Sequence, residues 1–89
     1  MSIAVNREMT QGPRDGQWRF RVTRTREHSN VRETTDVPLS HGIVVEIYRS
    51  VMGGLPATGL ERENVVENWD RLESRLRAEI ERRIPPDRP

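Results

Sequence analysis

Two residue types are missing from this chain of 89 residues, cysteine and lysine. The absence of cysteine excludes disulfide bonds, thiolate metal sites and cysteine nucleophiles. Because lysine is missing too, all fifteen strongly basic residues are arginine. Two explanations stay open. A GC-rich coding bias would replace lysine codons, whereas a crowded contact surface would favour the planar guanidinium, which pairs bidentately with carboxylate or phosphate.

Apolar and aromatic residues are also scarce. Apolar residues make up 33% of the chain, which is a thin supply for the core of a domain this small. We expect residues 1–84 to form a single domain and the proline-rich residues 85–89 to be disordered. The aromatic residues, which we expect to anchor the core, are Trp18, Phe20, Tyr48 and Trp69.

Long hydrophobic runs are absent as well. No apolar run approaches the length of a membrane span. Residues 1–5 lack the basic region and following apolar run that are typical of a secretory signal. We therefore expect a cytoplasmic protein of bacterial type with no membrane partner.

The net charge is only +1, but it is distributed unevenly. Residues 1–35 carry about three more arginines than acids, whereas residues 36–60 and 61–89 each carry a slight acidic excess. Nucleic-acid-binding domains usually show a clear basic excess, so a general affinity for polyanions is not indicated. Any basic contact surface should be local, on the N-terminal part of the chain.

Residues 18–26 alternate between apolar and polar side chains, which predicts a β-strand. A four-residue loop at 27–30 would return the chain as a partner strand over residues 31–39. Residues 2–9 predict a short additional edge strand. In the expected hairpin register apolar residues meet apolar ones and charges meet opposite charges. The expected pairs are Trp18 with Leu39, Phe20 with Val37, Val22 with Thr35, Arg24 with Glu33, Arg21 with Asp36, Thr23 with Thr34, and Thr25 with Arg32.

Residues 40–52 fit both a helix and a strand. The β-branched content and the alternation of residues 43–51 suit a strand. A helix would start with Ser40 as its N-cap and stop at Gly53 in the left-handed conformation. We favour the helix, because the Gly53-Gly54 pair followed by Leu55-Pro56 resembles a helix end.

Residues 60–84 contain neither glycine nor proline and predict one long C-terminal helix. Thr58 and Glu61 have the spacing of a capping box at its start. The outer face shows acid-first charge pairs at four-residue spacing, namely Glu67 with Arg71, Glu73 with Arg77 and Glu79 with Arg83. The apolar stripe of this helix comprises Val65, Val66, Trp69, Leu72, Leu76, Ile80 and Ile84.

The sequence thus predicts an α+β fold. A three-stranded antiparallel sheet, or a four-stranded one if residues 43–52 form a strand, would pack against the long amphipathic helix, with a second short helix before it. A helix of about 25 residues extends about 37 Å, more than the diameter of about 30 Å expected for a compact domain of this length. We therefore expect its stripe to need cover from another chain, most simply a second copy. The expected interface residues are Trp69, Leu72, Leu76, Ile80 and Ile84.

His28 and His41 are the only histidines, and both fall in segments expected to be exposed turns. No cysteine and no paired histidine spacing supports a metal site, so we expect no bound metal and no cofactor. Ser40 is adjacent to His41, but neighbours in sequence rarely point at each other, and a catalytic triad needs a scaffold and a cleft. We therefore expect no enzymatic activity.

The function that these features favour is a non-catalytic protein-interaction protein, such as a subunit, an adaptor or a protein inhibitor. It would bind a protein partner, in a homo-oligomer or a larger complex, through the helix stripe and a charged contact face formed by Arg14, Arg19 and Arg21. The main alternative is nucleic-acid binding by the arginine-rich hairpin. A third hypothesis is an accessory subunit of an enzyme complex.

Overall fold

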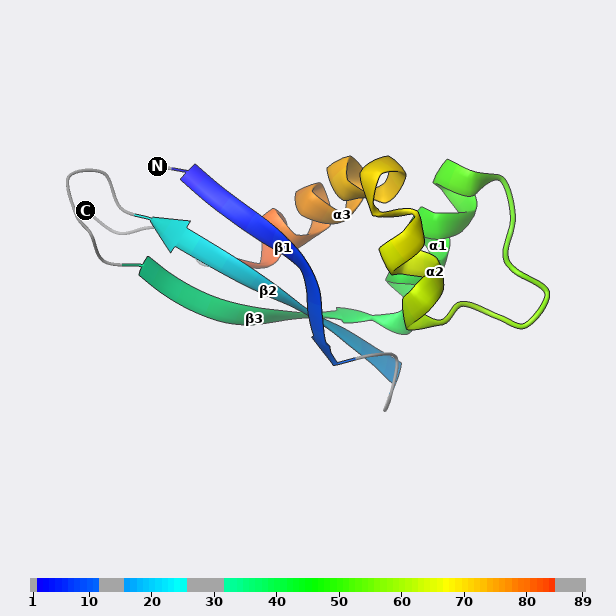
Figure 1. Ribbon diagram of the computed structural model, residues 1–89, viewed down its shortest axis with the longest axis horizontal. Helices are drawn as coiled ribbons and strands as arrows, with labels where there is room; N and C mark the ends of the chain where they lie inside the picture. Colours follow the sequence, from blue (N-terminus) through cyan, green and yellow to red (C-terminus); the bar gives the residue numbers. More distant parts are fainter. Residues whose placement is uncertain (1, 12–15, 26–31, 85–89) are drawn as a thin grey trace.

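The computed structural model of the chain describes residues 2–11, 16–25 and 32–84 and has an α+β fold (Figure 1). The predicted fold class is therefore confirmed. Three helices follow the strands along the chain, and the longest of them is C-terminal. In chain order the elements are β1 (Ser2–Gln11), β2 (Gln17–Thr25), β3 (Arg32–Ser40), α1 (His41–Met52), α2 (Arg62–Glu67) and α3 (Trp69–Arg83).

The strands form an antiparallel sheet in the order β1-β2-β3, so β3 lies at one edge. The predicted register of the hairpin is confirmed at every position from the Gln17–Ser40 pair to the Thr25–Arg32 pair. The residue numbers of each pair sum to 57, as the four-residue loop requires. The loop itself, at 27–30, lies outside the described residues. Between β1 and β2 the register shifts twice, on either side of Met9.

One face of the sheet is covered by α3, while α1 and α2 lie at one end of the molecule (Figure 1). Trp18, Phe20 and Val22 alternate along β2 and are all buried on the covered face. The ring of Phe20 lies 6.2 Å from that of Trp69, the first residue of α3, at an interplanar angle of 33°. This tilted aromatic contact joins the sheet layer to the helix layer.

Residues 41–52 form the helix α1, as favoured from the sequence. Ser40 has an extended backbone, and its hydroxyl accepts a hydrogen bond from the backbone N–H of Ile43. Gly53 ends the helix with a φ of 82°, a value that glycine adopts without steric cost, and its N–H donates to the carbonyl of Arg49. The side chains of residues 41–52 fit a helix or a strand, and the two caps favour the helix.

His41 joins the start of α1 to the sheet. The indole Nε1 of Trp18, a residue with 0% exposure, donates a 2.9 Å hydrogen bond to Nδ1 of His41. The planes of the two rings are parallel within 2°, and their centroids lie 6.0 Å apart. The expectation of an exposed turn at His41 was wrong, because this half-buried imidazole supplies the acceptor that the buried indole needs. His28 lies outside the described residues.

The C-terminal helix is not continuous. Residues 60–84 were expected to form one helix, but α2 ends at Glu67 and α3 begins at Trp69. The helix also starts later than expected, because Glu61 rather than Thr58 is the N-cap, and the side chain of Asn64 accepts the N–H of Glu61 at 2.8 Å. The predicted single helix and its predicted cap are therefore both wrong.

Asn68 accounts for the break. Its side-chain amide donates to the backbone carbonyl of Asn64 at 2.8 Å and to the hydroxyl of Tyr48 at 3.4 Å. Asparagine commonly competes for backbone partners in this way, which disfavours it within helices. Its φ of −105° and ψ of 17° lie outside the helical range, so α3 starts in a new direction with Asn68 before it. The contact with Tyr48 ties the break to α1.

The apolar stripe does not extend beyond the body of the protein. Ile80 has 0% exposure, and Ile84 is partly buried against the core. The molecule is 47 Å long, and the 15 residues of α3 span only about 22 Å of that length. The expected overhang was wrong for two reasons: the body is elongated rather than spherical, and the break at Asn68 shortens the helix.

The two adjacent valines of α2 provide a matched test of which side of this helix packs against the core. Val65 has 0% exposure and Val66 has 44%. Val65→Ala should lower the free energy of unfolding by about 2 kcal/mol, because it removes buried methyl groups and leaves a cavity. Val66→Ala should change it by less than about 0.5 kcal/mol. Urea unfolding of both variants measures the difference, and equal losses would contradict the placement of α2.

The hydrogen bond between Trp18 and His41 is tested by a double-mutant cycle. His41→Ala leaves the buried indole N–H without its acceptor and should cost about 1–3 kcal/mol of unfolding free energy. In a Trp18→Phe background, which has no N–H to satisfy, the same substitution should cost about 1 kcal/mol less. Additive effects of the two substitutions would show that the bond contributes nothing to stability.

Candidate interaction surfaces

The residues predicted as a helix interface lie in the core of this chain. Trp69, Leu72, Leu76 and Ile80 are all buried, and they pack against the sheet rather than facing outward. Ile84 is partly buried and lines a small cleft of about 230 Å³ where α3 ends, together with Val22 and Thr35. The structure therefore gathers these residues into a core and not into a contact surface.

None of the described helices covers the opposite face of the sheet (Figure 1). Residues that alternate with the buried ones face this side, which follows from the two-residue period of a strand. Arg19 is half-buried and Arg21 is exposed, so the structure places two of the predicted contact arginines on one face. Arg14, the third, lies outside the described residues. We call this surface, made of Arg19, Arg21, Thr23, Thr25, Arg32, Thr34, Asp36 and Pro38, the open sheet face.

Arg21 and Asp36 form an ion pair on the open sheet face. Nε of Arg21 lies 3.7 Å from Oδ1 of Asp36, its partner in the hairpin register, as the sequence predicted. Both side chains are more than 40% exposed, so water screens the pair and it contributes less than about 1 kcal/mol to stability. Such a pair can exchange partners, because breaking it leaves both charges solvated.

The outer edge of β3 forms a second exposed surface. The first five residues of β3, 32–36, are all exposed, on both faces of the strand. Pro38 follows closely, and proline in a sheet is typical of an edge strand because it has no N–H for a ladder hydrogen bond. Within the described part of the chain, no strand pairs with this edge.

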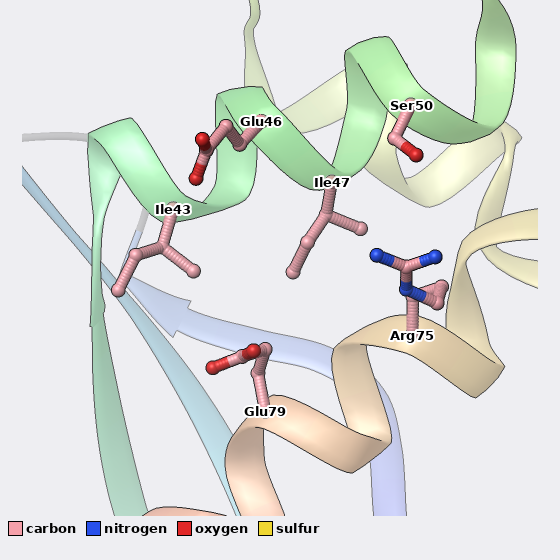
Figure 2. Close-up of a pocket in the computed structure, with 6 residues that line it drawn as sticks. All are labelled: Ile43, Glu46, Ile47, Ser50, Arg75 and Glu79. Atoms are coloured by element: carbon pink, nitrogen blue, oxygen red, sulfur yellow. The ribbon is translucent and has the colours of Figure 1, made fainter.

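A cleft of about 490 Å³ lies between α1 and α3 (Figure 2). Two isoleucines point into it from α1, and the guanidinium of Arg75 extends from α3 toward Ser50 (Figure 2). A serine can act as a nucleophile only if an adjacent base takes the proton of its hydroxyl. The guanidinium of Arg75 stays protonated, so Arg75 cannot be that base for Ser50. The lining residues are Ile43, Glu46, Ile47, Ser50, Arg75 and Glu79.

Glu79 is held by arginines one turn further along α3. Its carboxylate accepts hydrogen bonds from Arg83 at 2.8 Å and from Arg82 at 3.0 Å. The hydrogen bond from Arg83 is the largest cause of the lowered pKa of Glu79. Burial opposes it, and the positive charges of Arg82, Arg83 and Arg75 lower the pKa further. This carboxylate is therefore ionised and already paired.

The predicted charge pairs on the outer face of α3 are present where the helix is continuous. Arg77 and Glu73 form a 2.8 Å ion pair, as do Arg83 and Glu79. The third predicted pair, Glu67 with Arg71, spans the break at Asn68, where the four-residue helical spacing does not hold.

The described ranges hold neither a cluster of metal-ligating side chains nor a membrane-spanning helix. Among those residues, no three His, Asp or Glu side chains lie close enough together to hold a metal ion. Likewise, none of the described helices has both the length and the apolar character needed to cross a bilayer.

No family model matches the chain, and neither the curated proteins nor the solved structures include a significant match to it.

Sequence reasoning missed the cleft and the edge of β3 as surfaces. The cleft depends on where α1 packs against α3, which no local pattern encodes. The edge had one signal, Pro38, which is tolerated in a strand at an edge. Val66 was assigned to the buried stripe but is exposed, because the apolar arc assumed a single straight helix.

The paired state of Glu79 gives a measurable pH effect. Because its pKa is lowered on folding, ionised Glu79 contributes stability at neutral pH, and this contribution is lost as the pH falls through that lowered pKa. Arg83→Gln should raise the pKa of Glu79 toward its ordinary value, and Arg82→Gln should raise it less. Carboxyl NMR titration of both variants measures the shift. An unchanged pKa in Arg83→Gln would contradict the assigned cause.

Proposed function

We propose that this chain is a non-catalytic protein-interaction protein, a subunit, adaptor or protein inhibitor, that binds its partner through the open sheet face. The observation that carries the proposal is the one-sided packing of the sheet. The described helices all lie on one side of the sheet or at one end of the molecule (Figure 1). The residues of β2 and β3 that face the other side are charged, polar or proline, and they are exposed or half-buried. Such a face has no core to cover and is available for contact.

The arginines of the open sheet face define the partner's chemistry. Arg19 and Arg21 come from the central strand, and Arg32 comes from the edge strand. Among the β2 and β3 residues that define this surface, three are arginine and one, Asp36, is an acid. Guanidinium groups pair bidentately with carboxylates. An acidic protein surface is therefore the partner that these charges favour. Trp69, Leu72, Leu76 and Ile80 are buried in the core and take no part in this proposal.

Nucleic-acid binding is less well supported. Trp18 and Phe20 both have 0% exposure, so neither ring can stack on a base. The arginines would remain for phosphate contact, and binding through them alone would weaken steeply with salt.

Photo-crosslinking tests the proposal. A photo-reactive residue at Thr23, in the middle of the open sheet face, should give discrete protein adducts in an extract of the cells from which the chain comes. The same residue at Arg71, exposed on α3, is the matched control and should give few adducts. The double variant Arg19→Gln and Arg21→Gln should reduce the Thr23 adducts about tenfold, since each lost charge pair weakens binding.

Three results would contradict the proposed function. Equal adducts at Thr23 and Arg71 would remove the preference for the sheet face. Adducts that nuclease treatment abolishes would favour the nucleic-acid alternative. If the double variant gives as many Thr23 adducts as the wild type, Arg19 and Arg21 do not contribute to binding.

A further inference from the structure

The outer edge of β3 has a pattern that fits a second copy of itself. The strand is nine residues long, lies at the edge of the sheet, and is exposed along residues 32–36. An open edge presents backbone N–H and C=O groups that can pair with another strand. The outward backbone groups and the side chains of β3 determine which strand can pair with it.

Pro38 identifies the backbone groups that face the open edge. It pairs with Arg19 of β2, yet proline has no N–H to donate to that strand. Its nitrogen therefore faces the free edge. Because alternate residues of a strand direct their backbone groups to the same side, the N–H and C=O groups of Arg32, Thr34 and Asp36 also face outward.

The side chains of these three residues are self-complementary. An antiparallel copy of β3 placed on a two-fold axis at Thr34 sets Thr34 opposite Thr34 of the second copy. The same arrangement places Arg32 opposite Asp36 of the second copy, and Asp36 opposite Arg32 of the second copy. Both charge pairs lie on the open sheet face, where cross-strand neighbours of opposite charge stabilise pairing. A two-fold interface requires this kind of self-matching.

Other positions of the axis lose this match. An axis at Glu33 or at Asp36 sets a carboxylate against its own copy, and like charges directly opposite each other are destabilising. An axis at Thr35 places Arg32 opposite Pro38 of the second copy, so the charge pairs are lost. Charged side chains and a proline also discourage pairing with an arbitrary strand. The edge is thus selective.

We propose that two copies of this chain pair through β3, antiparallel and centred on Thr34, to form one continuous sheet across a two-fold axis. The inference goes beyond the proposed function, because it assigns a second copy of the chain to the outer edge of β3 and leaves the contact of an acidic protein with the open sheet face as a separate proposal. It also gives Asp36 a second cation besides Arg21, which the solvent exposure of that pair allows.

A charge exchange tests the register. Arg32→Asp sets two carboxylates opposite each other in a pair of identical copies, and Asp36→Arg sets two guanidinium groups opposite each other. Each variant should therefore dimerise at least about tenfold more weakly than the wild type. An equimolar mixture of the two variants restores opposite charges where the two strands pair and should regain the dimer. Sedimentation velocity over a concentration series, with native mass spectrometry of the mixture, measures this.

A cysteine scan tests the axis. The chain has no cysteine, so any disulfide in a single-cysteine variant joins two copies. Paired residues that exchange hydrogen bonds have Cα atoms about 5.5 Å apart, within the range that a disulfide spans. Thr34→Cys should therefore crosslink on mild oxidation. Thr35→Cys is the matched control and should not, because the two copies of residue 35 are diagonal neighbours about 7–8 Å apart.

The results separate this inference from the proposed function. A wild-type chain that stays monomeric up to about 1 mM, or a dimer that Arg32→Asp does not weaken, would overturn the β3 pairing. Thr23 adducts of the wild type that persist at concentrations where it sediments as a monomer, together with a dimer at higher concentration that Arg32→Asp weakens, support both ideas. A charge-dependent dimer without Thr23 adducts would support β3 pairing and contradict the acidic partner.

Discussion

The packing of the apolar side of β2 against α3 is the contact on which the rest of the structure depends. Trp18 and Phe20 are fully buried, and Phe20 meets Trp69 at the start of α3. Seven of the fifteen buried apolar residues of the described chain belong to β2 or α3, including both tryptophans and Phe20. The two-residue period of the strand then fixes the other face of the hairpin as arginine, threonine and aspartate.

This division of the hairpin decides which surfaces are available for function. The stripe residues Trp69, Leu72, Leu76 and Ile80 are covered by the core of this chain. In the proposed function, the arginines and Asp36 on the open sheet face and the β3 edge would supply specificity rather than hydrophobic affinity. Binding through such surfaces should be selective and sensitive to charge, which suits a subunit or an adaptor.

Local patterns predicted the register of the hairpin, because alternation, charge pairing and the assumed loop length all require the same one. Ser40 and Gly53 likewise decided α1 through caps that act within one turn. The break at Asn68 was not predictable, since it depends on a hydrogen bond to Tyr48 from a distant helix. The burial of Ile80 was missed because the expected diameter of the domain assumed a spherical shape. Tertiary packing gives an elongated molecule that covers this residue. Of the candidate site, the arginines were predicted but the edge was not.

Amide hydrogen exchange along β3 tests the central claim most directly. If the packing of β2 leaves this edge open for a second copy, the N–H groups of Thr34 and Asp36 exchange rapidly in dilute protein and become protected as the concentration rises. The N–H groups of Glu33 and Thr35, which face β2, stay protected throughout. Protection of Thr34 and Asp36 that does not depend on concentration would contradict the account.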